Sequence, residues 1–240
     1  MSERKFEIDI LIPVFNEKEV IESTLSEINE KINISHRIFI IYDFEEDSTL
    51  PVVKKYIDVK KHNNIILLKN DYGRGVVNAL RKGFDSAVAL TTLVVMGDLS
   101  DDLAIVNIMY RKIKKDRFDL VCGSRYMKGG KQIGGPKLKK ILSRMAGLSL
   151  HWITDIPTHD ISNSFKMYRT SMVKTFKLES TGGFEIGLEI LVKAFIHGYN
   201  ITEVASTWKD RAAGASNFKL WKWLPNYLKW YWVAIIKKSK

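Results

Sequence analysis

Acidic residues lie at the ends of two apolar, strand-like segments of the sequence, where they could bind a cation or a sugar. Asp43 is at the end of one segment and Asp98 at the end of another. The carboxyl ends of parallel strands meet at one edge of a sheet, and ligands bind there. Carboxylates at that edge can hold a divalent cation or ribose hydroxyl groups. Acids after strands also cap the following helix, and for Asp101 and Asp102 the two interpretations are equally good.

A glycine-flanked arginine follows the third strand-like segment. Residues 71–75 read Asp-Tyr-Gly-Arg-Gly and directly precede a predicted helix, so Arg74 lies close to a helix N-terminus. An arginine and the free backbone N–H groups of a helix N-terminus can together hold a phosphate. With the carboxylates at the same edge of the sheet, this arrangement outlines a nucleoside-diphosphate site.

Several other nucleotide and metal motifs are absent from the sequence. A dinucleotide-binding domain needs G-x-G-x-x-G after its first strand, and this chain has PVFNE at residues 13–17. The chain has no Walker A loop, and its His and Cys residues do not have the spacing of a zinc site. We therefore exclude these three classes of site.

Alternating strand-like and helix-like segments position these residues. Apolar runs predict strands over 6–15, 36–44, 65–70, 91–98, 118–126, 163–168 and 200–207. Helical spacing of apolar residues predicts helices over 21–32, 48–60, 76–87, 102–115, 138–152 and 184–197, with a glycine-rich loop over 127–136. Such alternation predicts an α/β fold with a mostly parallel sheet flanked by helices.

Eight segments of the chain, taken in order, resemble one known family. They are ILIPVFNEKEVI (10–21), IYDFEEDST (41–49), NDYGRGVVNALRKGF (70–84), VVMGDLSDD (94–102), CGSRY (122–126), DISNSFKMYR (160–169), FEIGLEILVKAFIHGYNITEV (184–204) and RAAGAS (211–216). The chain resembles the inverting family 2 glycosyltransferases of the GT-A fold. Within that family it is most similar to the dolichol- or polyprenol-phosphate mannose and glucose synthases. Any one segment is a weak signal, but eight in the family order are specific.

The resemblance implies a nucleotide-sugar donor and a divalent cation. The residues it places around the base and ribose are Pro13, Phe15, Glu17 and Asp43. Arg74 would lie by the phosphates, and Asp98 would be the main metal ligand, holding Mg²⁺ or Mn²⁺ against the pyrophosphate.

The resemblance also implies the groups around the acceptor. Arg125, Arg211 and Ser216 would bind phosphate groups of the donor or the acceptor. Asp160 would face the sugar or the acceptor, so Asp98, Asp160 and Arg125 are the expected catalytic residues.

Two departures from the family pattern affect these expectations. The D-x-D metal motif has Met96 in place of its first acid and Ser100 in place of its later polar ligand, so Asp101 or Asp102 could compensate. The family's R-x-x-G-x-S-K pattern, which starts here at Arg211, ends in Asn217. A catalytically degenerate scaffold is the corresponding alternative to an active enzyme.

The expected reaction is attack of an acceptor oxygen on the anomeric carbon of a nucleotide-sugar, with inversion. A polyprenyl phosphate is the favoured acceptor, and its oxygen is already anionic near pH 7, so no strong base is needed. The alternative acceptor is a soluble or lipid-linked glycan of a surface polysaccharide pathway, whose hydroxyl would need a base, first of all Asp160. Glu185 and Glu189 lie four residues apart on a predicted helix and face either the site or solvent.

The net charge of +11 comes from two segments without acids, 120–154 and 211–240. Such segments indicate a polyanionic partner. We divide the chain into a transferase domain over 1–207 and a basic, Trp-rich, amphipathic helical tail over 208–240. The composition of the tail is typical of a helix that lies in a membrane interface. The alternative is a helix packed on its own domain or on a dimer partner, and the oligomeric state stays open.

The sequence also predicts where the protein is located and which class of partner it does not bind. The sequence shows no secretory signal, no apolar run long enough to cross a bilayer, and a single cysteine, Cys122. We therefore expect a cytoplasmic protein, peripheral on the cytoplasmic face of the membrane. A nucleic-acid partner is not expected, because carboxylates at the strand ends would repel a phosphate backbone.

Overall fold

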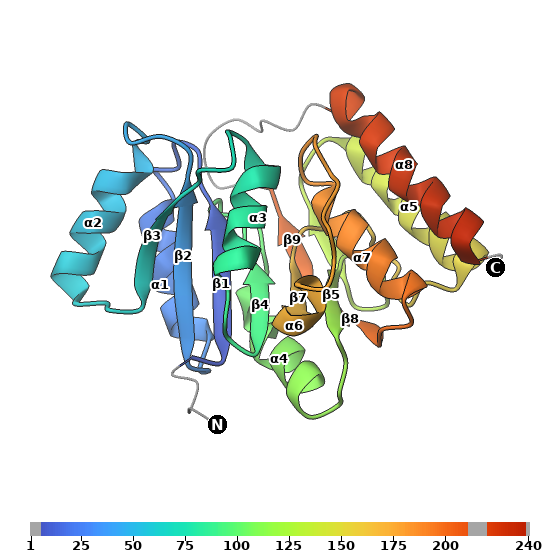
Figure 1. Ribbon diagram of the computed structural model, residues 1–240, viewed down its shortest axis with the longest axis horizontal. Helices are drawn as coiled ribbons and strands as arrows, with labels where there is room; N and C mark the ends of the chain where they lie inside the picture. The colour runs from blue at the N-terminus through green and yellow to red at the C-terminus, as the bar shows by residue number, and fades with distance from the viewer. Residues whose placement is uncertain (1–5, 211–219, 239–240) are drawn as a thin grey trace.

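A seven-stranded sheet forms the centre of the molecule in the computed structural model, which describes residues 6–210 and 220–238 (Figure 1). The strand order is β3-β2-β1-β4-β7-β5-β8, and only β7 within it runs antiparallel to its neighbours. The strands are β1 Ile8–Pro13, β2 His36–Tyr42, β3 Ile65–Lys69, β4 Thr91–Val94, β5 Leu120–Ser124, β7 Lys166–Arg169 and β8 Ile201–Ala205. The expected mostly parallel sheet flanked by helices is confirmed.

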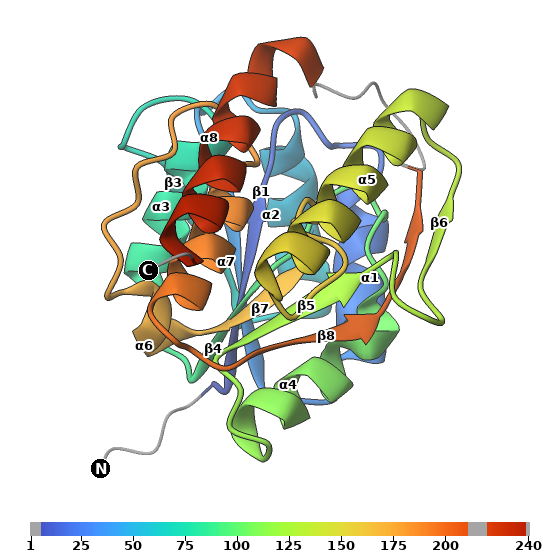
Figure 2. The same ribbon diagram turned by 90° about the vertical axis from the view of Figure 1, so that its right-hand side faces the viewer.

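Helices cover both faces of the sheet (Figures 1 and 2). One face carries α1 Ile21–Lys31, α2 Thr49–Lys60 and α4 Val106–Lys114, which follows a short 3₁₀ turn, Leu103–Ile105. The other face carries α3 Val76–Ser86, α5 Lys137–Thr154, α7 Ile186–Ile196 and the C-terminal helix α8 Leu220–Lys238. Successive residues of β1 belong to different cores: Ile10 packs with the first group and Leu11 with the second. This double burial explains why the central strands are almost wholly apolar.

Three elements were not predicted from the sequence. β6 Lys131–Ile133 lies in the predicted glycine-rich loop and pairs in parallel with β9 Thr207–Lys209 in a separate two-stranded sheet. The four-residue helix α6 Thr170–Val173 follows β7. β6 and β9 have largely exposed or half-buried side chains, so neither segment carries the apolar run that marks a strand. The expected division between 207 and 208 stays a prediction.

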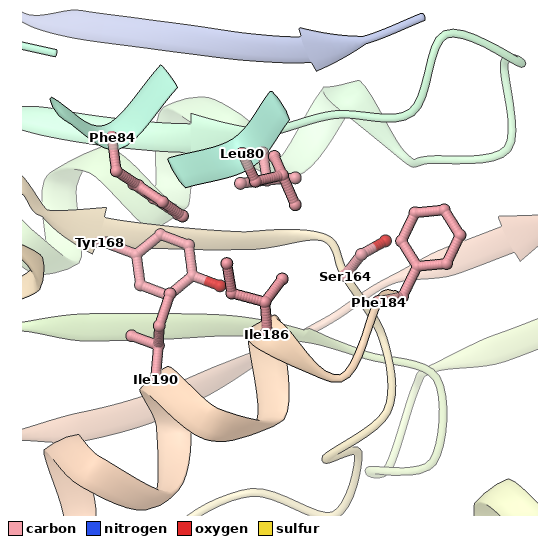
Figure 3. A pocket seen from close by; sticks show the side chains of 9 residues that line it. Leu80, Phe84, Ser164, Tyr168, Phe184, Ile186 and Ile190 are labelled. Atoms are coloured by element: carbon pink, nitrogen blue, oxygen red, sulfur yellow. The ribbon is translucent and has the colours of Figure 1, made fainter. Parts of the chain in front are cut away.

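A small apolar cavity lies between α3, β4, β7 and α7 (Figure 3). Its volume is about 10 Å³, close to that of a single water-sized probe. The ring of Phe84 meets the ring of Tyr168 edge-on at 5.5 Å beside it, and the Tyr168 hydroxyl points toward Ile186. Gly187 also lines the cavity.

We expect Gly187→Ala to stabilise the fold. A Cβ there would lie 3.8 Å from the Tyr168 hydroxyl and 3.9 Å from the Lys166 Nζ, both ordinary contacts, and alanine restricts the unfolded chain, so the gain should be about 0.5 kcal/mol. Gly147→Ala is the contrasting variant, because a Cβ there would collide with the His159 carbonyl oxygen. Urea denaturation of both variants measures the two effects. A destabilised Gly187→Ala would contradict the packing described for the cavity.

Candidate active site

The turns after β1 and β2 present two aromatic rings at the carboxyl edge of the sheet. Phe15 is 53% exposed and meets Phe44 edge-on at 5.7 Å. Asp47 holds this turn by accepting the Asn16 N–H at 3.1 Å and the Thr49 N–H at 2.8 Å. Exposed Phe15 and half-buried Phe44 at this edge offer a surface on which a nucleobase could stack.

Two other predicted residues of the donor site border this turn. Pro13 is half-buried at the end of β1. Glu17 is also half-buried, and its N–H donates to the Thr49 hydroxyl at 2.9 Å.

Asp43 links the end of β2 to the loop that carries Arg74. Its carboxylate accepts the Asn70 side-chain amide at 2.7 Å and the Gly75 N–H at 2.8 Å. Gly75 has φ of 115°, a backbone conformation that residues other than glycine rarely adopt. In this conformation its N–H points toward Asp43. The Arg74 guanidinium lies 5.5 Å from the Phe44 ring centre. The structure thus brings Phe15, Asp43 and Arg74 together through Phe44 and Asn70, which the sequence analysis missed. Asn70 directly follows β3 as Asp43 follows β2, and that shared position was the available signal.

Asp101 and Asp102, which follow β4, differ in the contacts that they make. Asp102 caps the 3₁₀ turn by accepting the Ala104 N–H at 3.3 Å, and it accepts the Thr207 N–H of β9 at 3.1 Å. Asp101 accepts the Met96 N–H at 2.9 Å and is buried with Asp98 nearby. Burial raises the pKa of Asp101 to about 7, and the negative charge of Asp98 acts in the same direction. Of the two acids proposed to compensate for Met96, Asp101 lies close enough to Asp98 for that charge to raise its pKa.

This carboxyl pair fits a divalent cation bound jointly with a substrate. Mg²⁺ is usually held by one or two carboxylates together with phosphate oxygens, and a cation would offset the repulsion between Asp98 and Asp101. Within residues 6–210 and 220–238, no group of three or more His, Cys, Asp or Glu side chains forms a metal cluster. The remaining ligands would therefore have to come from the diphosphate, solvent or backbone.

Arg125 and Asp160 form a buried ion pair beyond the end of β5. The Arg125 Nε lies 2.7 Å from one carboxylate oxygen of Asp160, and an Nη lies 2.9 Å from the other. The Asp160 side chain is wholly buried. Burial alone would raise the pKa of Asp160, but the charge and hydrogen bonds of Arg125 outweigh it and lower the pKa. Lys166, buried on β7, donates to the carbonyls of Ile161 and Asn163 and so holds the turn after Asp160.

Glu185 and Glu189 face the protein interior rather than solvent. Both are wholly buried. Glu185 accepts the N–H groups of Gly182 at 2.6 Å and Gly183 at 2.5 Å. Glu189 accepts those of Glu179 at 2.6 Å and Ser180 at 2.8 Å. The two acids therefore fix the shape of the 178–183 loop from inside.

A cavity of about 220 Å³ opens between this loop and the N-terminus of α3. Its lining includes Arg74, Asn78, Arg81, Thr181 and Gly182. Arg81 donates to the carbonyls of residues 178 and 180 at 2.8 and 2.7 Å. Arg74 lies just before the N-terminus of α3 and Arg81 lies in the middle of that helix, and together they make this cavity suitable for a phosphate or a polar sugar. The sequence analysis missed Arg81, which lies on α3 seven residues after Arg74.

Two of the expected phosphate-binding residues, Arg211 and Ser216, lie outside the residues that the structure describes.

Comparison with known protein families agrees with the resemblance. Residues 9–176 match the model of a family described as Glycosyl transferase family 2. The chain belongs to this family. The expected identification of the chain as a family 2 glycosyltransferase is therefore confirmed.

Three curated relatives are about equally similar to this chain. A dolichol-phosphate mannosyltransferase of Pyrococcus furiosus is 28% identical over 88% of the chain and 59% of its own length. A dodecaprenyl-phosphate galacturonate synthase of Rhizobium johnstonii is 26% identical over 90% of the chain and 62% of its length. A dolichyl-phosphate β-glucosyltransferase of Dictyostelium discoideum is 27% identical over 85% of the chain and 66% of its length. The chain thus spans less than two thirds of each of these relatives.

Solved structures show the same fold. Glucosyl-3-phosphoglycerate synthase of Mycobacterium tuberculosis, in complex with Mn²⁺, UDP-glucose and phosphoglyceric acid, superposes with a TM-score of 0.69 at 12% identity, covering 98% of this chain and 80% of that one. The same enzyme with Mg²⁺ and UDP gives a TM-score of 0.66 at 12% identity, covering 97% of this chain and 79% of that one. The similarity establishes the GT-A-like fold.

We expect Asp160→Asn to destabilise the protein by about 3 kcal/mol, because it leaves the buried Arg125 charge without its counter-charge. Denaturant unfolding at pH 7 measures this loss. Because the pKa of Asp160 is lowered, its ionised form stabilises the fold. This stabilisation is complete at pH values above the ordinary carboxyl pKa of ~3.9 and is lost as the pH falls through the lowered pKa. The difference in free energy of unfolding between variant and wild type should therefore become smaller below pH ~4. Asp116→Asn in the exposed turn after α4 is the control, and equal stability of the two variants would refute the assigned pair.

Proposed function

We propose that this protein transfers a sugar, with inversion, from a nucleoside-diphosphate sugar to a polyprenyl phosphate at a membrane surface. The observation that carries the proposal is the carboxyl edge of the sheet, where Phe15, Asp43 and Arg74 converge beside the buried acids that follow β4. This set offers a stacking surface, acceptors for hydroxyl groups and a cation for phosphate. The printed names of the three curated relatives each include a dolichol, dolichyl or dodecaprenyl phosphate.

In this proposal the donor lies along the carboxyl edge. Pro13, Phe15, Glu17 and Asp43 contact the base and ribose, and Arg74 contacts the phosphates. Asp98, with Asp101 beside it, holds Mg²⁺ or Mn²⁺. The cation supplies positive charge to the leaving diphosphate.

The acceptor side depends on Arg125. A phosphate oxygen of the acceptor forms the new bond to the anomeric carbon as the bond to the diphosphate breaks, and Arg125 binds the reacting phosphate. The Asp160 carboxylate is buried, and Arg125 lowers its pKa, so Asp160 is better suited to positioning Arg125 than to accepting a proton. A phosphate acceptor needs no base, and this agreement favours it over a glycan hydroxyl. Arg211 and Ser216 are proposed as further phosphate ligands from the resemblance alone.

The outer faces of α5 and α8 support a lipid partner. The two helices lie side by side (Figure 2), and the Ser149 hydroxyl of α5 lies 2.8 Å from the Tyr231 hydroxyl of α8. Their exposed large apolar residues are Leu138, Ile141, Leu142, Met145, Trp152, Ile153, Leu228, Trp232 and Ile236. Lysines and Arg144 accompany them on both helices. In the part of the chain that the structure describes, no helix is long and apolar enough to span a bilayer, so we propose that this surface lies in the membrane interface.

The direct test is a transfer assay. A thermal-shift screen of GDP-, UDP- and dTDP-sugars with and without Mn²⁺ identifies the donor. The stabilising donor is then incubated with a short polyprenyl phosphate, and the product is identified by mass spectrometry. Transfer to a glycan in place of the polyprenyl phosphate would establish the alternative acceptor.

We expect Asp98→Asn to abolish transfer and cation-dependent nucleotide binding while leaving the fold intact, because the variant removes the charge that holds the cation. Calorimetry of nucleotide binding with and without Mn²⁺, and circular dichroism, measure the two properties. Asp116→Asn, an exposed acid distant in sequence from the site, is the matched control. Near-normal turnover of Asp98→Asn would show that the cation site is misassigned.

We expect the double variant Trp152→Ala/Trp232→Ala to bind anionic vesicles more weakly than wild type. The two rings are 78% and 56% exposed on the adjacent helices, and nearby lysines should contribute roughly 1 kcal/mol each at an anionic surface. Binding should also weaken as salt rises. Co-sedimentation with phosphatidylglycerol vesicles at low and high salt measures both effects, with Val59→Ala on α2 as the exposed apolar control. Wild-type protein that stays in the supernatant at low salt would make a soluble acceptor the better choice.

A further inference from the structure

The C-terminal helix α8 has a second face that is turned toward the protein. Trp230 and Ala234 are buried among residues of α7, and Trp223, Asn226 and Tyr227 continue this face toward the start of the helix. Burial and the charge of Glu185 raise the pKa of Tyr227, while the charge of Arg125 acts against the shift. The inner face of α8 therefore reaches the interior next to the site.

Two residues of this inner face pack closely on glycines of the 178–183 loop. The Trp223 indole lies on Gly183, where a Cβ would come within 3.1 Å of three ring carbons. Asn226 lies so close to Gly182 that a Cβ there would collide with its amide. Neither glycine has a left-handed backbone conformation. A side chain at either position would therefore have to displace a residue of α8, and at position 182 it would also crowd the Glu185 carboxylate, which a Cβ would approach to 2.9 Å.

The loop that α8 covers is also a wall of the cavity beside Arg74. Thr181 and Gly182 line that cavity of about 220 Å³. Glu185 and Glu189 fix the loop through its N–H groups, and Arg81 fixes it through two carbonyls. All of these anchors lie on α3 or at the start of α7. On the outer side, Trp223 and Asn226 supply the close packing on the glycines.

We propose that Trp223 and Asn226 are positioning residues of the donor site, which hold the 178–183 loop against the Arg74 cavity. The inference rests on the proposed function, because it assigns this cavity to the sugar or diphosphate of the donor. A loop already fixed in its bound shape loses little entropy when the ligand binds. Removal of the Trp223 ring frees the outer side of the loop, so the donor must then order it. The helix that faces the lipid therefore also sets donor affinity, even where no membrane is present.

The test uses the full chain without membranes. Calorimetry measures binding of the sugar nucleotide that stabilises wild type in the thermal-shift screen, together with UDP and GDP alone, in the presence of Mn²⁺. Trp223→Ala should bind the donor about tenfold more weakly, with a raised KM and little change in kcat. Trp223→Phe retains a ring over Gly183 and should recover affinity to within about twofold of wild type.

Two further variants separate this role from stability and from lipid binding. Asn226→Ala removes the contact with Gly182 while keeping the indole, and it should also weaken donor binding, even if Trp223→Ala fails to fold. Trp232→Ala, on the outer face of the same helix, should bind vesicles more weakly and keep the donor affinity of wild type.

The possible outcomes distinguish the two proposals. Wild-type affinity in folded Trp223→Ala, or in Asn226→Ala where Trp223→Ala does not fold, would overturn the positioning role even if the melting temperature fell. The proposed function would then still stand. A wild-type protein that binds none of the nucleotide-sugars would overturn the proposed function and this inference with it.

Discussion

Backbone N–H groups that are shielded from water need an acceptor, and in this protein carboxylates, most of them buried, supply acceptors at nearly every loop of the site. The acids that do so are Asp43, Asp47, Asp101, Asp160, Glu185 and Glu189. Loops at a sheet edge have few regular hydrogen bonds of their own, so their shape depends on these contacts. Most acids of the site therefore serve first to hold its loops in shape. A ligand would meet a surface that the acids have already shaped.

Two groups of charged residues lie in the site, the acids Asp98 and Asp101 and the ion pair of Arg125 with Asp160. Burial raises the pKa of Asp101 to about 7, and repulsion from the Asp98 charge acts in the same direction. The Arg125 charge acts in the opposite direction on the same carboxyl while it pairs with Asp160. The proposed cation-binding pair and a buried arginine thus influence one another electrostatically. Under the proposed function, such proximity suits a reaction in which negative charge passes from an acceptor phosphate to a leaving diphosphate.

The sequence predicted the fold well because most strands here are continuous apolar runs and most helices are amphipathic. It did not predict β6 and β9, which are short and largely polar and are defined by pairing partners far apart in the chain. Asp43, Arg74 and Asp98 could be placed at one edge because topology alone brings strand ends together. The orientation of Glu185 could not be predicted, because helical spacing does not say which face a neighbouring loop will cover. Nor could the bidentate geometry of Arg125 and Asp160, which are 35 residues apart.

The C-terminal helix shows why composition alone left two interpretations open. A face of tryptophan and apolar residues is equally typical of a helix in a lipid interface and of one packed on protein. In this structure the buried Trp230 and the exposed Trp232 lie only two residues apart, so one helix has both kinds of face. A single amphipathic helix with two aromatic faces can pack on α7 while presenting its other side outward with α5. Under the proposed function, the lipid of the acceptor would stay with the outer face, and its phosphate would need to reach only as far as Arg125.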